Sequence, residues 1–260
     1  MNPTLIRRAG AFTMVSAAVA ALAGCGGIGA QLTYHDVEKV KVTEILMTGA
    51  SGDVTVHTSA IGETRITRTV RSSSDPDRGY TLDGTVLTLD TDCGADCTVS
   101  YDVEAPAGVT VRGKLQSGDV NLTGVSATDV TLNSGDILVR DAAADVKATT
   151  TSGNITVEGA KGATTLHATS GDVDANGVGG GPVQATSTSG DVTITLNTPA
   201  PVTAETTSGD AVVRVPASGS YHVRADSHSG DTRVEIPDDA KSSNLITVKA
   251  TSGDAMVQTA

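Results

Sequence analysis

Two of the three cysteines, Cys93 and Cys97, stand close together in the run Cys-Gly-Ala-Asp-Cys. Gly94 allows a tight turn between them, and such a turn brings two Cα atoms within the distance that a disulfide spans. A zinc site is the alternative chemistry, but it needs about four ligands, and no second His or Cys pair lies nearby in the sequence. We therefore predict a disulfide between Cys93 and Cys97 that fastens a hairpin in an oxidising compartment.

A second set of chemically capable side chains is a series of aspartates, each preceded by Ser-Gly. Its members are Asp119, Asp136, Asp172, Asp191, Asp210, Asp231 and Asp254, with Asn154 in place of one. If these turns stack, neighbouring carboxylates approach to ~5 Å and repel each other. One interpretation is that each carboxylate faces solvent and accepts hydrogen bonds from its own turn. The other is a calcium ladder, since Ca²⁺ prefers hard oxygen ligands. Against calcium, the turns lack the extra glycines and second acidic position of calcium-binding β-rolls.

The remaining polar residues do not indicate catalysis. A serine nucleophile needs a histidine oriented by a carboxylate, and the histidines occur in unrelated contexts, at His35, His57, His167, His222 and His228. Paired carboxylates that cleave polysaccharides need a cleft walled by long loops, whereas the insertions here are short and lie at 216–220 and 237–244. The sequence therefore predicts no enzyme, no catalytic residue and no cofactor.

The aspartates belong to a repeat that fills most of the chain. Ser-Gly-Asp, or once Ser-Gly-Asn, begins at Ser51, Ser117, Ser134, Ser152, Ser170, Ser189, Ser208, Ser229 and Ser252. From Ser117 onward the steps are 17, 18, 18, 19, 19, 21 and 23 residues. A period this short and this sustained indicates stacked supersecondary units.

On both sides of each turn, small or apolar residues alternate with polar ones, which is the pattern of a half-buried strand. The predicted inward positions include Val183, Ala185 and Ser187 before one turn, Val192 and Ile194 after it, and Thr232 and Val234 after the turn at Ser229. Across the turn the alternation slips by one residue, as at a corner or bulge. Glycine suits that corner because a positive φ has no steric cost for it.

We therefore predict an all-β fold, a single-stranded parallel β-solenoid (β-helix) with rungs of about 18 residues over 116–260. An irregular β region over 37–115 would hold the first rung and cap the N-terminal end. The alternatives are an antiparallel β-meander or sandwich, in which each Ser-Gly-Asp closes a hairpin, and a left-handed hexapeptide helix. The last strand, at 256–260, has no charged or helical cap, so we expect an unpaired edge there, with end-to-end self-association or strand addition by a partner.

Composition restricts the partners. The chain has 260 residues with 18 Lys and Arg against 30 Asp and Glu, a net charge of −12, and no basic stripe that would bind nucleic acid. Aromatic residues make up only 2%, so stacking on sugars or bases is not expected. The core must consist of Val, Ile, Leu, Ala and Thr.

The N-terminus is typical of an export signal. Arg7 and Arg8 are followed by an apolar stretch that is short for a bilayer span, and then by Leu22-Ala23-Gly24-Cys25. This arrangement resembles bacterial lipoprotein precursors. The resemblance implies removal of a signal peptide at 1–24 and attachment of diacylglycerol to the Cys25 sulfur. Residues 25–36 would then form a lipidated, flexible tether on the extracytoplasmic face of the cell membrane.

Several motifs together resemble a bacterial family of β-strand-repeat domains of unknown function that carries the label adhesin. They are Glu44-Ile45-Leu46-Met47, Ser51-Gly52-Asp53, the Pro-containing strand at 103–109 and the repeated Ser-Gly-Asp-Val. The resemblance spans about 37–260. It implies an extracytoplasmic β-solenoid with a role in the cell envelope. The predicted function is a non-enzymatic, membrane-anchored surface lipoprotein that binds an envelope glycan, another cell or a partner protein. The alternative is a structural or stress-sensing envelope lipoprotein that acts through a protein partner.

Overall fold

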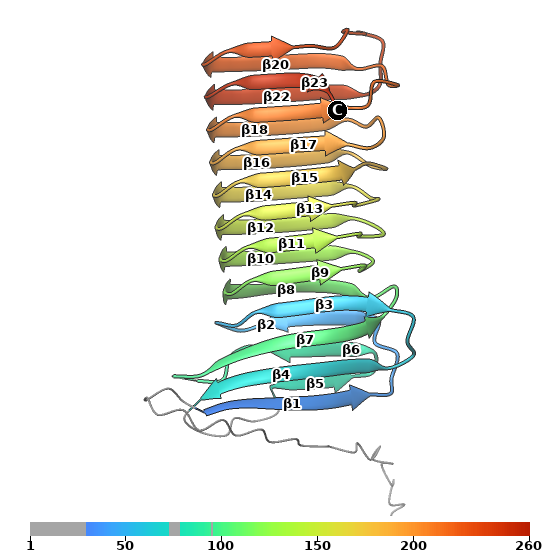
Figure 1. The fold of residues 1–260 in the computed structure, drawn as a ribbon, viewed down its shortest axis with the longest axis vertical. Helices are drawn as coiled ribbons and strands as arrows, with labels where there is room; N and C mark the ends of the chain where they lie inside the picture. The colour runs from blue at the N-terminus through green and yellow to red at the C-terminus, as the bar shows by residue number, and fades with distance from the viewer. Residues whose placement is uncertain (1–29, 73–78, 95) are drawn as a thin grey trace, which may run out of the picture.

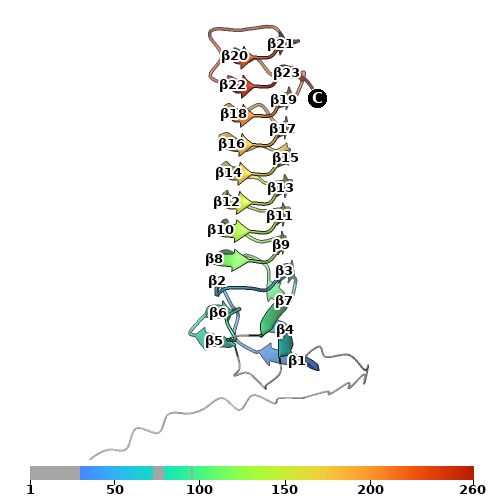
Figure 2. The same ribbon diagram turned by 90° about the vertical axis from the view of Figure 1, so that its left-hand side faces the viewer.

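The computed structural model describes residues 30–72, 79–94 and 96–260. These residues form 23 strands and no helix, arranged in one sheet of 12 strands and one of 11 that face each other along a rod (Figures 1 and 2). The all-β prediction is confirmed. The side chains between the two sheets form one continuous core of small and branched residues.

Along most of the rod, one rung consists of a strand of the 11-stranded sheet, a Ser-Gly-Asp or Ser-Gly-Asn corner and a strand of the 12-stranded sheet. The regular rungs are β8–β9 (Thr110–Ser117, Val120–Thr123), β10–β11 (Thr128–Ser134, Ile137–Arg140), β12–β13 (Val146–Ser152, Ile155–Glu158), β14–β15 (Thr164–Ser170, Val173–Val178), β16–β17 (Val183–Ser189, Val192–Leu196), β18–β19 (Val202–Ser208, Ala211–Val215), β20–β21 (His222–Ser229, Thr232–Val234) and β22–β23 (Leu245–Ser252, Ala255–Thr259).

Adjacent rungs pair in parallel and in register. Ser134, for example, lies beside Ser117 on one side and Ser152 on the other. The parallel β-solenoid is thus confirmed, and the antiparallel meander is wrong for this region. The predicted alternation also holds in the middle of the rod, because Val183, Ala185 and Ser187 are buried while the residues between them are not. Small inward residues let the two sheets pack closely without aromatic side chains.

The N-terminal end is less regular. Its strands are β1 (Ala30–Glu38), β2 (Glu44–Thr48), β3 (Val54–Ser59), β4 (Thr64–Ser72), β5 (Tyr80–Asp83), β6 (Val86–Asp90) and β7 (Thr98–Pro106). β2–β3 and β6–β7 are two further rungs, because β2 is parallel to β6 and β3 is parallel to β7. β1, β4 and β5 add antiparallel strands below them and close this end. The tether predicted over 25–36 is therefore too long, since residues 30–36 belong to β1.

The order of rungs in space differs from their order in sequence at both ends. β2–β3 lies between β6–β7 and β8–β9, and the last repeat, β22–β23, lies between β18–β19 and β20–β21 (Figure 2). Ala255 pairs with Ala211 on one side and Thr232 on the other. The unpaired edge predicted for 256–260 is consequently wrong for Met256 and Val257, which have a paired strand on each side. The open end of the rod is formed by β20 and β21.

In the 11-stranded sheet, the first residues of neighbouring strands form a row in the core that contains threonines as well as valines. Thr128 and Thr164 stand on either side of Val146. Both threonines are buried, and among the described residues neither Oγ1 atom has a hydrogen-bond partner. A buried hydroxyl without a partner costs free energy that an apolar group of the same shape does not.

We expect Thr164→Val to stabilise the protein by about 1 kcal/mol, because valine fills the same space without an unpaired hydroxyl. The melting temperature should rise by about 2–4 °C in a protein of this size. The matched control is Val146→Thr in the adjacent rung, which should lower it by a similar amount. A lower melting temperature for Thr164→Val would mean that the hydroxyl has a partner in solution.

Candidate functional site

The corner aspartates form a ladder of hydrogen bonds from rung to rung. The Asp136 N–H donates to Asp119 Oδ1 at 2.9 Å, and the Asp210 N–H donates to Asp191 Oδ1 at 2.8 Å. The same bond joins Asp119 to Asp53, Asn154 to Asp136, Asp172 to Asn154, Asp191 to Asp172, Asp254 to Asp210 and Asp231 to Asp254. The prediction that each carboxylate is held by its own turn is therefore wrong, because the donor lies in the next rung.

Asn154 shows what this ladder requires. Its side-chain oxygen accepts the Asp172 N–H at 2.9 Å, as an aspartate would, although it carries no charge. The ladder thus needs a short side chain with an acceptor oxygen rather than a negative charge. Each bond also places a partly positive N–H beside a carboxylate, which offsets some of the repulsion between neighbouring rungs.

Within the described residues, no group of three or more His, Cys, Asp or Glu side chains is placed to hold a metal ion. One oxygen of each inner corner aspartate already accepts a backbone bond, and Asn154 interrupts the series of charges. The calcium ladder stays a prediction that this geometry does not favour.

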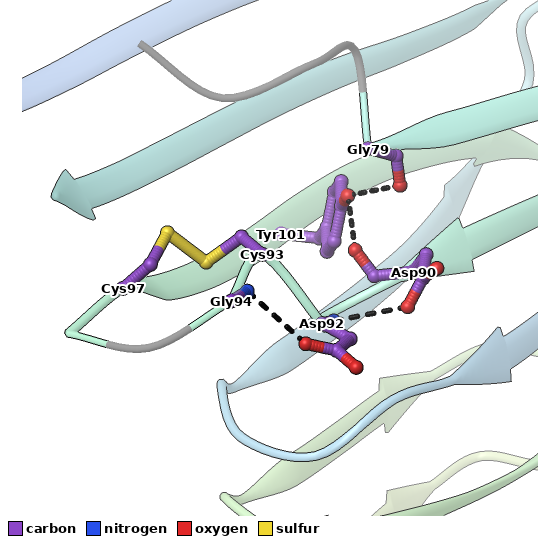
Figure 3. Close-up of a disulfide and its surroundings, with 7 residues drawn as sticks. All are labelled: Gly79, Asp90, Asp92, Cys93, Gly94, Cys97 and Tyr101. Atoms are coloured by element: carbon purple, nitrogen blue, oxygen red, sulfur yellow. Dashed lines mark hydrogen bonds between the residues drawn. A yellow bond between two sulfur atoms is a disulfide. The ribbon is translucent and has the colours of Figure 1, made fainter. Parts of the chain in front are cut away.

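The disulfide is confirmed. Cys93 and Cys97 are bonded, with their Cα atoms 5.6 Å apart. Their turn lies at the corner of the rung β6–β7, where other rungs have Ser-Gly-Asp, so it joins strands of two sheets and does not fasten a hairpin as expected. The Asp92 side chain accepts the Gly94 N–H at 3.1 Å inside this turn (Figure 3).

Tyrosines are confined to the two ends of the described rod. Tyr34, Tyr80 and Tyr101 lie in the N-terminal end, and Tyr221 lies near the open end. The Tyr101 hydroxyl lies within hydrogen-bond distance of the carbonyl oxygens of Gly79 and Asp90 (Figure 3), and burial raises its pKa. The Arg68 guanidinium stacks 4.4 Å from the centroid of the Tyr34 ring. Large side chains are suited to the ends because a terminal layer lacks a neighbouring rung on one side.

Four of the histidines contact polar side chains: three of these partners lie on strands, and the partner of His222 lies in the loop after β21. His57 lies 3.5 Å from Asp102 and His222 lies 3.1 Å from Asp238. His35 and His167 contact the hydroxyls of Thr67 and Thr186. Among the described residues, none of these histidines bonds to a serine hydroxyl, so the structure brings no nucleophile, base and carboxylate together there.

The predicted lipidation site, Cys25, and the signal segment at 1–24 lie outside the described residues. The described part of the chain contains no helix with the length and hydropathy of a membrane span.

The open end of the rod differs from the sequence prediction. The alternation predicts that Thr232 and Val234 point into the core, but both are exposed, and the exposed fraction of Val234 is 43%. The signal that could have revealed this is the lengthening of the last two steps of the repeat, to 21 and 23 residues, which gives the chain enough length to skip one rung and return.

The sequence matches the Toastrack DUF4097 family over residues 30–165 and again over 109–259. The chain belongs to this family. The two overlapping matches reflect the repeat, because a solenoid aligns with itself after a shift by whole rungs.

Three solved structures resemble this Toastrack chain. They are a putative adhesin from Parabacteroides distasonis (13% identity, TM-score 0.42, covering 89% of this chain and 98% of that one), a putative adhesin from Bacteroides fragilis (14%, 0.34, 88% and 97%) and a putative cell adhesion protein from Clostridium sporogenes (10%, 0.34, 88% and 100%). No curated protein matches the chain.

Proposed function

We propose that this Toastrack protein is a non-enzymatic surface lipoprotein, anchored through Cys25 to the extracytoplasmic face of the cell membrane, that binds an envelope component or another cell. The observation that carries the proposal is the placement of the two ends. The first described strand, β1, lies at the closed end of the rod, and β20 and β21 lie at the opposite end (Figure 2).

The dimensions support a role in presenting a surface at a distance. Ten rungs give nine steps, and at ~4.8 Å per step the regular stack is about 43 Å long. β1 begins at Ala30, five residues after Cys25. A short link of this kind holds the closed end near the membrane and directs the rod outward. The disulfide Cys93–Cys97 agrees with an exported protein.

The binding role is tested with the mature chain, residues 25–260, carrying Cys25→Ser and used as a soluble bait on whole cells, purified cell wall and isolated membranes. We expect retention on cells or wall. Retention on one cognate membrane protein alone would instead support the structural or stress-sensing role. Failure to bind any of the three would contradict the binding role. The control bait is the same chain after thermal unfolding, which separates binding by the folded rod from binding by an acidic polypeptide.

A further inference from the structure

The corner of each regular rung presents a glycine N–H, the N–H two residues later and a side-chain Oδ1 to the next rung toward the open end. At four corners the glycine carbonyl also accepts a Ser or Thr hydroxyl from that rung. All four contacts occur between the rung β22–β23 and the rung β20–β21. The Gly253 N–H donates to Ser229 O at 3.1 Å, and the Ala255 N–H donates to Asp231 O at 2.9 Å. Asp254 Oδ1 accepts the Asp231 N–H at 2.8 Å. Gly253 O accepts the Ser227 hydroxyl at 2.7 Å.

The terminal rung, β20–β21, carries the same four groups without a rung to receive them. By position they are the Gly230 N–H, the Thr232 N–H, Asp231 Oδ1 and Gly230 O. Gly230 is exposed, whereas the corner glycines of the other regular rungs are half-buried. The inward side chains of this rung are also uncovered, since Val234 is exposed and Ala225 is only half-buried. An open strand edge with unpaired backbone groups is a template for another strand.

Only part of this end is open. The loop after β21 covers the beginning of β20: the Asp239 N–H donates to Tyr221 O, and Asp238 Oδ1 accepts the Val223 N–H. Ile236, in the same loop, is buried. The uncovered region therefore runs from Arg224 around the Ser-Gly-Asp corner to Val234. We call this region the tip.

We propose that the tip binds a strand–turn–strand segment of a partner protein, ~10 residues long and with a corner of the Ser-Gly-Asp type, which adds to the rod as a further parallel half-rung. Such a segment supplies what an inner rung supplies: a Ser carbonyl for the Gly230 N–H, an Asp carbonyl for the Thr232 N–H, an Asp N–H for Asp231 Oδ1 and a hydroxyl for Gly230 O. Its apolar side chains would cover Val234 and Ala225. This proposal rests on the proposed function and specifies the kind of protein segment that the partner supplies.

A second copy of this chain fits the tip less well. The opposite end of the rod is closed by antiparallel strands, with β1 and β5 outermost, so it does not present a corner in the required register. Two tips facing each other would bring the covering loops at 235–244 of both copies into the same contact. The geometry favours a partner with an accessible strand and turn.

The expected affinity is low. A segment of ~10 residues buries far less than the ~800 Å² per partner of a standard interface, and its ordering upon binding has an entropic cost. At a surface, many rods side by side would raise the apparent affinity by avidity.

The test uses the mature chain, residues 25–260, carrying Cys25→Ser, and a fluorescent peptide with the sequence of residues 202–215, which contains one native corner. Binding is followed by anisotropy up to ~1 mM protein. We expect saturable binding that Asp231→Ala weakens about tenfold, because the variant loses one charge-assisted hydrogen bond. Asp231 lies in the outermost rung of the described residues, where no further rung uses its Oδ1, and the variant should retain its melting temperature. Thr232→Pro removes the open N–H and should also weaken binding.

The matched control is Asp226→Ala, which removes an exposed carboxylate from β20 on its outward face and should change the affinity less than twofold. A peptide with valine at the corner glycine should not bind. Absence of binding to the unsubstituted tip, or equal binding to Asp231→Ala and Asp226→Ala, would overturn the proposal. So would a dimer in sedimentation that Asp231→Ala abolishes, since the occupant would then be a second copy. Because the assay uses a soluble chain, its failure is separate from a failure of membrane anchoring.

Discussion

Replacing Gly209 by valine is expected to destabilise the protein by about 2–6 kcal/mol. Gly209 has a φ of +137°, and a Cβ atom at this position would lie 2.4 Å from Gly190 O. Two costs therefore add. A β-branched residue at this φ costs about 1–3 kcal/mol, and the forced separation of two rungs costs about 1–3 kcal/mol more.

Two control glycines separate these costs. Gly84 has a φ of +60°, but a Cβ atom there would meet no atom within 4 Å, and Gly62 has neither restriction. Thermal or urea unfolding should rank the valine variants Gly62, Gly84, Gly209 in order of increasing loss. If Gly209→Val melted like Gly62→Val, the corners would be exposed loops without special geometry.

Replacing Cys25 by serine is expected to move nearly all of the protein from the membrane fraction to the soluble fraction, with its melting temperature unchanged. The reason is that serine has no sulfur to receive the lipid, while the first described strand begins only at Ala30. A fully acylated N-terminal cysteine holds a protein at a bilayer, whereas the unmodified chain has no comparable apolar segment after processing.

The matched control is the double variant Cys93→Ser, Cys97→Ser, which also removes thiol chemistry but leaves Cys25. It should stay in the membrane fraction and melt at a lower temperature, because it lacks the cross-link at the corner of β6–β7. Immunoblots of the two fractions measure the distribution. Cys25→Ser protein that has lost residues 1–24, as judged by its mass, and still sediments with membranes would rule out the lipid anchor.

The local structure of a rung follows from the sequence alone. The alternation Val183, Ala185, Ser187 predicts a strand with one buried face, and the glycine of each Ser-Gly-Asp predicts a corner with a positive φ, as at Gly190. Repetition in phase predicts parallel stacking. The spacing of Cys93 and Cys97 likewise predicts their bond. These features depend on residues that are near each other in the chain, or on a period that a single sequence displays.

Only the tertiary structure decided the order of the rungs and the direction of the ladder. Every rung offers the same register and the same hydrogen-bonding groups, so the pattern does not specify which rung lies beside which. At the C-terminal end the longer connections let β22–β23 insert between β18–β19 and β20–β21. This order covers the last strand and leaves Asp231 and Val234 at the tip. The corner carboxylates bond to the next rung because stacking brings that N–H into range, a contact between residues 17 or more positions apart. Local sequence patterns therefore determine the structure of one rung. Because the rungs are equivalent, these patterns do not determine which rungs are neighbours, and only the folded chain fixes that order.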